Sequence, residues 1–298
     1  MNKQAATPAS TNKSSWAAFK RFIKTPKGYA LGALILLTLV GSTSPQGHMG
    51  IQHALAAVIA AAVFDAAVAK LLKRRVTVST GGVITGLIVA DVLSGLDPLY
   101  VVVLTTLIAL ASKHLLKRGR KPIFNPAAVG LLAAIGIFGA AESWWAGMAL
   151  MPVWYLALML AVGIFVSIRV KKYPQALTFM ATYLLGVLVM AYFHLGIASA
   201  TPADALREPF INSALFLGFF MLTDPPTSPG TTPEQVVFSI ITGIVSVGMF
   251  MTFGGLTYLL VGLLAGNVFT AVLAQLRSPV KKITKVETPN RASASSGA

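Results

Sequence analysis

The sequence predicts an all-α polytopic membrane protein, with about ten transmembrane segments in two inverted five-helix repeats. Three observations support this: an apolar composition, basic clusters between alternate segments, and two short apolar segments at matching places. Of 298 residues, 55% are hydrophobic and only 11% are charged, whereas soluble domains carry roughly 25% charged residues. Cysteine is absent. This excludes a disulfide framework, thiolate metal sites, iron–sulfur clusters held by this chain and a Cys nucleophile.

Apolar segments account for most of the chain. They cover residues 29–40, 50–72, 83–92, 99–116, 125–140, 150–168, 176–193, 212–222, 236–253 and 256–276. They define a membrane domain at 29–277, with repeats at about 29–140 and 149–277. Residues 1–28 form a basic cytoplasmic tail, in which 16–23 are typical of a short helix on the membrane surface. Residues 278–298 are predicted to be a disordered cytoplasmic tail. Trp144, Trp145 and Trp154 are predicted to lie at the membrane interface.

The positive charge follows the expected topology. If the N-terminus is cytoplasmic, nearly all Lys and Arg fall on the cytoplasmic side, in clusters at 20–27, 70–75, 113–121, 169–172 and 277–285. The loops 41–53, 141–147 and 196–208 contain almost none. We therefore expect a multi-pass cell-membrane protein with both termini in the cytoplasm. The net charge of +15 reflects this topology and attraction to anionic lipid, so we expect no nucleic-acid binding.

The third and eighth segments are too short to span a bilayer, which needs about 20 apolar residues. Residues 84–91 (ITGLIVAD) and 217–224 (LGFFMLTD) match in pattern, and each ends on an acid, Asp91 or Asp224, before a proline-containing break. Asn125 and Asn267 occupy comparable places later in the two halves. Interrupted segments at matching positions of inverted halves predict a binding site at the repeat interface. The alternative is that short helices and prolines only shape a tightly packed bundle.

Three polar motifs are predicted to converge on the cytoplasmic leaflet: residues 79–82 (STGG), 121–128 (KPIFNPAA) and 223–227 (TDPPT). Helix starts offer free N–H groups, and prolines open gaps in the hydrogen-bond ladder. This set suits a flat heteroaromatic ligand with ring nitrogens and carbonyls, and equally a small polar permeant. The candidate binding residues are Thr80, Gly82, Thr85, Lys121, Asn125, Pro126, Thr223, Asp224 and Thr227. For Asp65, midway along the second segment, ion coupling and hydrogen-bonded packing are both open.

Residues 84–87 (ITGL), 123–127 (IFNPA) and 220–227 (FMLTDPPT) resemble the RnfD/NqrB family. RnfD is a membrane component of the Rnf electron-transport complex, and NqrB is its relative in the sodium-pumping NADH:quinone reductase. The resemblance covers about residues 30–277. It implies a fold similar to urea transporters, a non-covalent flavin (riboflavin or FMN) within the membrane domain, and a second, covalent FMN on an extracytoplasmic threonine. Beside Asn125, Lys121 would then offset the charge of a reduced flavin, unless it only marks topology.

The chain departs from the family in the loop expected to carry covalent FMN. Residues 141–147 contain no acceptor motif. A look-alike at 196–202 (GIASATP) includes Thr201, but it lies in another loop and has Leu195 where an acid is expected. We therefore expect a family member that has lost the covalent flavin site and keeps only the intramembrane flavin. The alternative is covalent attachment of FMN at Thr201.

The resemblance implies electron transfer across the membrane. The donor would be a cytoplasmic flavin or iron–sulfur reductase, and the recipient an extracytoplasmic FMN-bearing protein or another redox acceptor. The alternatives are a channel or carrier for a small polar solute and a flavin transporter.

Overall fold

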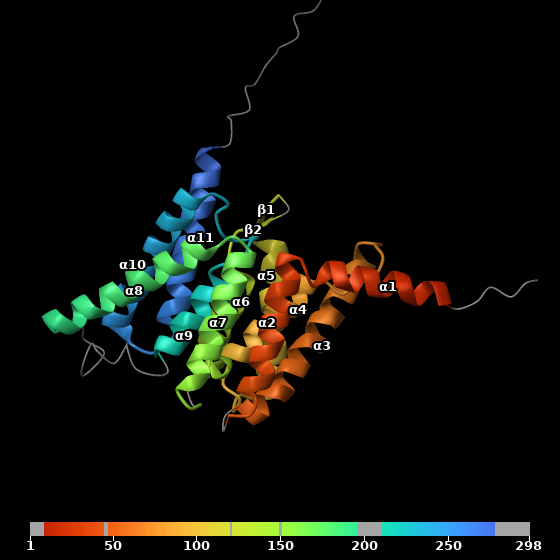
Figure 1. The fold of residues 1–298 in the computed structure, drawn as a ribbon, viewed down its shortest axis with the longest axis horizontal. Coiled ribbons are helices and arrows are strands. Elements are labelled where there is room, and N and C mark those ends of the chain that lie inside the picture. The colour runs from red at the N-terminus through yellow and green to blue at the C-terminus, as the bar shows by residue number, and fades with distance from the viewer. Residues whose placement is uncertain (1–8, 45–46, 120, 149–150, 196–209, 278–298) are drawn as a thin grey trace, which may run out of the picture.

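A computed structural model describes residues 9–44, 47–119, 121–148, 151–195 and 210–277. The described chain is almost entirely helical (Figure 1). Its α-helices are α1 (Ala9–Phe22), α2 (Pro26–Gly41), α3 (Gly47–Leu71), α4 (Thr80–Val92), α5 (Leu99–Leu115), α6 (Pro126–Phe138), α7 (Trp154–Arg169), α8 (Tyr173–Phe193), α9 (Phe210–Phe216), α10 (Thr232–Phe253) and α11 (Tyr258–Leu276). A short antiparallel pair, β1 (Lys117–Arg118) and β2 (Lys121–Pro122), precedes α6.

Each predicted apolar segment contains a helix. The eighth is irregular, because α9 continues into a π-helical turn, η3 (Leu217–Met221), and the helix then stops. Four helices are long and apolar enough to cross a membrane: α3, α8, α10 and α11; the bent pair of α1 and α2 would make a fifth. The remaining apolar helices of the described chain are shorter. The fold is therefore that of an all-α membrane protein, and a count of ten spans stays a prediction.

The helices fall into two groups that meet in the middle of the molecule (Figure 1). In one group α3 packs against α4 and α5, and in the other α10 packs against α8 and α11. Helices α2 and α7 pack together where the groups meet, as do α6 and α11. Small residues allow close approach: a Cβ on Gly86 of α4 would lie 2.9 Å from the carbonyl oxygen of Ala57 in α3.

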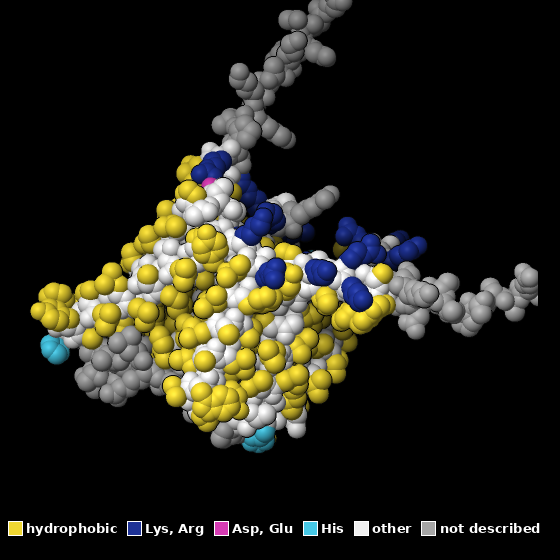
Figure 2. All heavy atoms as spheres, viewed as in Figure 1, with side chains coloured by type: hydrophobic (Ala, Val, Ile, Leu, Met, Phe, Trp, Pro, Cys, Tyr) yellow, Lys and Arg dark blue, Asp and Glu magenta, His cyan; other side chains and the backbone are white. Residues whose placement is uncertain are grey.

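The outer surface separates apolar from basic residues (Figure 2). Large hydrophobic side chains are exposed along helices, including Leu55 and Ile59 of α3 and Leu185 of α8, each at least 60% exposed. Lys and Arg gather at one end of the molecule, which we call the basic end. It includes Lys27, Lys113 and Lys121 around one cavity, Lys172, which interacts electrostatically with Lys121, and Lys70 in the last turn of α3. An apolar circumference with charge at one end fits a multi-pass protein surrounded by lipid.

At the basic end, α1 leaves the bundle at 87° to α2. Trp16 and Phe19 of α1 stack with ring centroids 5.6 Å apart and are exposed. The predicted helix at residues 16–23 is therefore present, although it begins earlier. Helix α2 also begins before the predicted boundary, because Thr25 caps it by accepting from the Gly28 N–H and Pro26 occupies its first turn. Residues 278–298 lie outside the described chain.

Trp144 and Trp145 are buried in the protein, so the prediction that they form part of a lipid-facing interfacial belt is wrong. They are 1% and 3% exposed, whereas Trp154 is 62% exposed. The loop that carries the first two folds back onto the end of the short helix α4. There the Trp145 indole donates to the Ala90 carbonyl at 2.7 Å, and a Cβ on Gly50 would lie 2.5 Å from its ring. The short helix leaves space that the indole fills.

Candidate functional site

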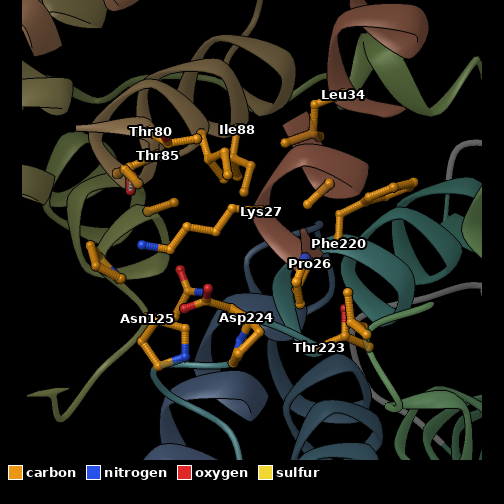
Figure 3. A pocket seen from close by; sticks show the side chains of 18 of the residues that line it. Pro26, Lys27, Leu34, Thr80, Thr85, Ile88, Asn125, Phe220, Thr223 and Asp224 are labelled. Atoms are coloured by element: carbon orange, nitrogen blue, oxygen red, sulfur yellow. Dashed lines mark hydrogen bonds between the residues drawn. The ribbon is translucent and has the colours of Figure 1, made fainter. Parts of the chain in front are cut away.

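A cavity of about 840 Å³ opens at the basic end (Figure 3). Its volume lies in the range of small-molecule and cofactor sites, roughly 300–1,000 Å³. The walls come from the first turns of α2, α4 and α6, from η3 and the loop after it, and from the end of α7. Apolar side chains such as Ile84, Ile88, Phe219 and Phe220 line much of it. The cavity therefore lies where the two helix groups meet.

Seven of the nine predicted binding residues line this cavity: Thr80, Thr85, Lys121, Asn125, Pro126, Thr223 and Asp224. Two do not. Gly82 lies against Ser79 and Asp65. A Cβ on Gly82 would be 2.9 Å from the Ser79 hydroxyl oxygen and 2.9 Å from an Asp65 carboxylate oxygen. Thr227 is buried and donates to the Asp224 carboxylate at 3.0 Å. The structure brings the three motifs together, while binding by these residues stays a prediction.

Three helices begin at the cavity. In each, a side chain before the first turn accepts a backbone N–H: Thr25 for α2 at 3.1 Å, Ser79 for α4 at 2.9 Å and Asn125 for α6 at 3.1 Å. The positive end of a helix dipole lies at its N-terminus. The cavity thus collects three positive helix ends from separate parts of the chain.

Asn125 holds the motifs together. Its side-chain amide donates to the Met221 carbonyl at the end of η3, at 3.0 Å. Its backbone N–H donates to Asn267 Oδ1 of α11 at 2.7 Å. Asn267 in turn donates to the Thr227 carbonyl at 3.1 Å. Two asparagines at comparable places in the sequence halves therefore meet, and they fix the loop after η3 against the start of α6.

Asp224 supplies the acid of the cavity wall. Burial raises the pKa of its carboxyl, and the hydrogen bond from Thr227 and the nearby lysines act in the opposite direction. Behind the loop, the Lys172 ammonium donates to the Pro229 carbonyl. Burial lowers the pKa of Lys172 to about 8, against the effect of Asp224. The loop that carries Asp224 is therefore held from both sides.

Sequence reasoning missed several lining residues. Lys27 and Lys113 carry the same basic signal as every other cluster, and they were interpreted as topology alone. Phe219 and Phe220 belong to the short apolar eighth segment, where nothing distinguishes a lipid-facing ring from one that faces a cavity. Closeness to a helix start or a helix break could have identified some of these lining residues. Lys27 lies in the first turn of α2, and both phenylalanines precede the break at Thr223.

The other acids lie elsewhere. Asp65 accepts the Ser79 backbone N–H at 2.7 Å, so it fixes the start of α4; this contact favours hydrogen-bonded packing over ion coupling. Asp91 is fully buried, with Oδ1 accepting from the Thr38 hydroxyl at 2.9 Å, and does not line the cavity. Thr201, the candidate for covalent FMN, lies outside the described residues.

Comparison with known proteins adds no assignment. Neither a scan of protein-family models nor a search of curated proteins finds a match to this chain. The resemblance to the two electron-transport proteins therefore stands on the sequence motifs. The class that the structure itself defines is a helical membrane protein with a ligand-sized cavity at its basic end.

Proposed function

We propose that the protein is the membrane component of a flavin-dependent electron-transport system and that it binds flavin in the cavity between the helix groups. One observation supports this most directly. Motifs that resemble a flavin-carrying family lie far apart in the sequence, and ten of their residues line one cavity of suitable volume. Residues that serve only to bend separate helices have no reason to share a cavity.

The lining fits a fused aromatic ring system with polar edges. Phe219, Phe220 and Ile88 offer apolar surface for the ring faces. Thr85, Asn125 and Asp224 offer hydroxyl, amide and carboxyl groups for ring nitrogens and carbonyls. The Asn125 amide has two hydrogens, and Met221 accepts one of them. The second has no acceptor within the described residues, so it is available to a ligand.

When bound, a flavin supplies the two-electron and one-electron chemistry of such a system. The chain supplies binding and electrostatics. Lys121 lines the cavity, and its positive charge beside Asn125 favours the more negative, reduced form of a bound ring system. The apolar walls exclude water. Asp224, whose pKa burial raises, offers a carboxyl for exchange of the accompanying proton.

We further propose ten spans in two inverted repeats, α2 to α6 and α7 to α11, with both termini and the cavity on the cytoplasmic side. Packing between α2 and α7, and between α6 and α11, supports this arrangement, because these helices are counterparts in the two halves. A flavin at one leaflet does not reach across about 30 Å of hydrocarbon. A cytoplasmic reductase would donate electrons, and a second centre, on an extracytoplasmic partner or on Thr201, would receive them.

The test is the absorbance of the protein purified in detergent. A flavin spectrum that dithionite bleaches is expected from wild type, with loss of flavin in Asn125→Ala. Asn212→Ala is the matched control: Asn212 is also a buried asparagine whose amide donates to a carbonyl, that of Gly147 at 2.7 Å, but it does not line the cavity. In-gel fluorescence after denaturation, lost in Thr201→Ala, would reveal covalent FMN.

A carrier for a small polar solute remains the second candidate. The observation that favours it is a partly charged cavity that opens at one end between two helix groups, which is what an inward-facing carrier presents. A colourless protein that moves solute into liposomes would establish the carrier and refute the flavin proposal. Movement of riboflavin itself would indicate a flavin transporter.

A further inference from the structure

The charged lining of the cavity is unbalanced. Lys27, Lys113 and Lys121 line the cavity together with one acid, Asp224, and a second acid, Asp65, interacts electrostatically with Lys113 from behind the start of α4. Within the described residues none of these ammonium groups makes a salt bridge. Lys27 and Lys121 are exposed and Lys113 is partly buried, and positive charges clustered at the mouth of a cavity attract an anion. Three lysines around one ligand-sized cavity therefore point to an anionic group on the ligand.

Two of the lysines converge on the start of α4. A Cβ on Gly81 would lie 2.9 Å from the Lys113 ammonium nitrogen, so the absence of a side chain there lets the ammonium approach the helix. Lys27 interacts electrostatically with Lys113, and Figure 3 shows it extending from α2 across the cavity towards Thr80 and Thr85. Like charges repel each other, and an anion between the two ammonium groups would remove the repulsion.

The backbone supplies further donors at the same place. The N–H groups of Thr80 and Gly81, in the first turn of α4, have no hydrogen-bond partner among the described residues, whereas Gly82 donates to the Ser79 side chain. Free N–H groups at a helix start favour phosphate binding. Here they accompany lysines inside a cavity, so the helix start is one part of a larger site.

We propose that the cavity takes a flavin with a phosphate monoester, FMN rather than riboflavin, and that Lys27, Lys113 and the first turn of α4 hold the phosphate. This proposal rests on the proposed function, since it specifies which flavin occupies the cavity. The apolar walls accept the ring system, and the cationic side of the cavity accepts the phosphate. Riboflavin would leave that side without an anion.

The experiment compares two ligands that differ only in the phosphate. Flavin-free protein in detergent is titrated with FMN and with riboflavin at low ionic strength, and binding is followed by the change in flavin fluorescence. FMN is expected to bind at least about tenfold tighter, as charge-assisted hydrogen bonds are the strong ones. Inorganic phosphate is expected to weaken FMN binding and leave riboflavin binding unchanged.

The variants separate the phosphate site from the fold. Lys27→Gln and Lys113→Gln should each weaken FMN binding about tenfold and leave riboflavin binding unchanged, which also shows that the variants fold. Lys113→Arg should restore FMN binding. Lys70→Gln, at the basic end but away from the cavity, should change neither. Equal affinity of wild type for both flavins would overturn the phosphate site and leave the flavin cavity intact. Binding of neither flavin would overturn the proposed function as well.

Discussion

Removing the Asn125 side chain tests how the cavity is assembled. In Asn125→Ala, α6 loses its cap, at a cost of about 1 kcal/mol. The Met221 carbonyl also loses its donor and is left buried without a partner, at about 1–3 kcal/mol. Because Asn125 is 2% exposed, water does not easily replace either contact. The expected loss of folding free energy is therefore about 2–4 kcal/mol, together with weaker ligand binding as the loop after η3 shifts.

Reversible unfolding in mixed micelles, monitored by tryptophan fluorescence, measures this loss. Asn125→Ser keeps a capping oxygen but lacks the donor for Met221, so its loss should fall between wild type and Asn125→Ala. Asn212→Ala should lose a comparable amount of stability through its own bond to Gly147 and leave ligand affinity unchanged. An Asn125→Ala protein within about 0.5 kcal/mol of wild type, with unaltered ligand binding, would refute the reasoning.

Three further perturbations give separate tests. Gly163→Ala places a methyl group 2.4 Å from the Phe219 ring, so it should cost about 1–3 kcal/mol and weaken ligand binding; Gly136→Ala, with open space around it, should do neither. Trp145→Ala should lose about 3–5 kcal/mol of folding free energy in the same unfolding assay. A loss smaller than that of Trp154→Ala, at an exposed tryptophan, would contradict the burial of Trp145. Burial raises the pKa of Glu142 from its ordinary 4.5 to about 7, so the carboxyl stabilises the fold most at low pH, and this contribution disappears as pH rises to about 7. Glu142→Gln should abolish that dependence, and an unchanged stability profile would show that the carboxyl is solvated.

Much of the fold was predictable because the bilayer restricts the choices. Apolar runs predicted a helix in each of ten places, and the structure has one there. The early stop of the eighth segment at Thr223 was also predictable, since two prolines and an acid follow. The π-helical turn at 217–221 was not, because it depends on how η3 packs against α7 and α8. The burial of Trp144 and Trp145 likewise depends on the space above the short helix α4.

For the site, sequence motifs identified the chain segments better than the individual atoms. Ser79-Thr80 and Asn125-Pro126 are helix-start signals with a local cause, and their segments do line the cavity. Gly82 and Thr227 belong to the same motifs but face the protein, since a motif does not say which side of a turn points inward. Lys27 and Lys113 were indistinguishable from topology markers until α2 and α5 were placed beside α4.

The sequence alone determined that this chain is a helical membrane protein, which segments are helical, where the eighth segment breaks, and which loops carry the positive charge. These features follow from local hydrophobicity, proline geometry and the charge of loops, which act over a few residues. Tertiary structure decided that three helix starts, two phenylalanines and three lysines enclose one cavity. Their convergence depends on the packing of segments up to about 200 residues apart in the chain. No local pattern records which side chains such packing brings face to face.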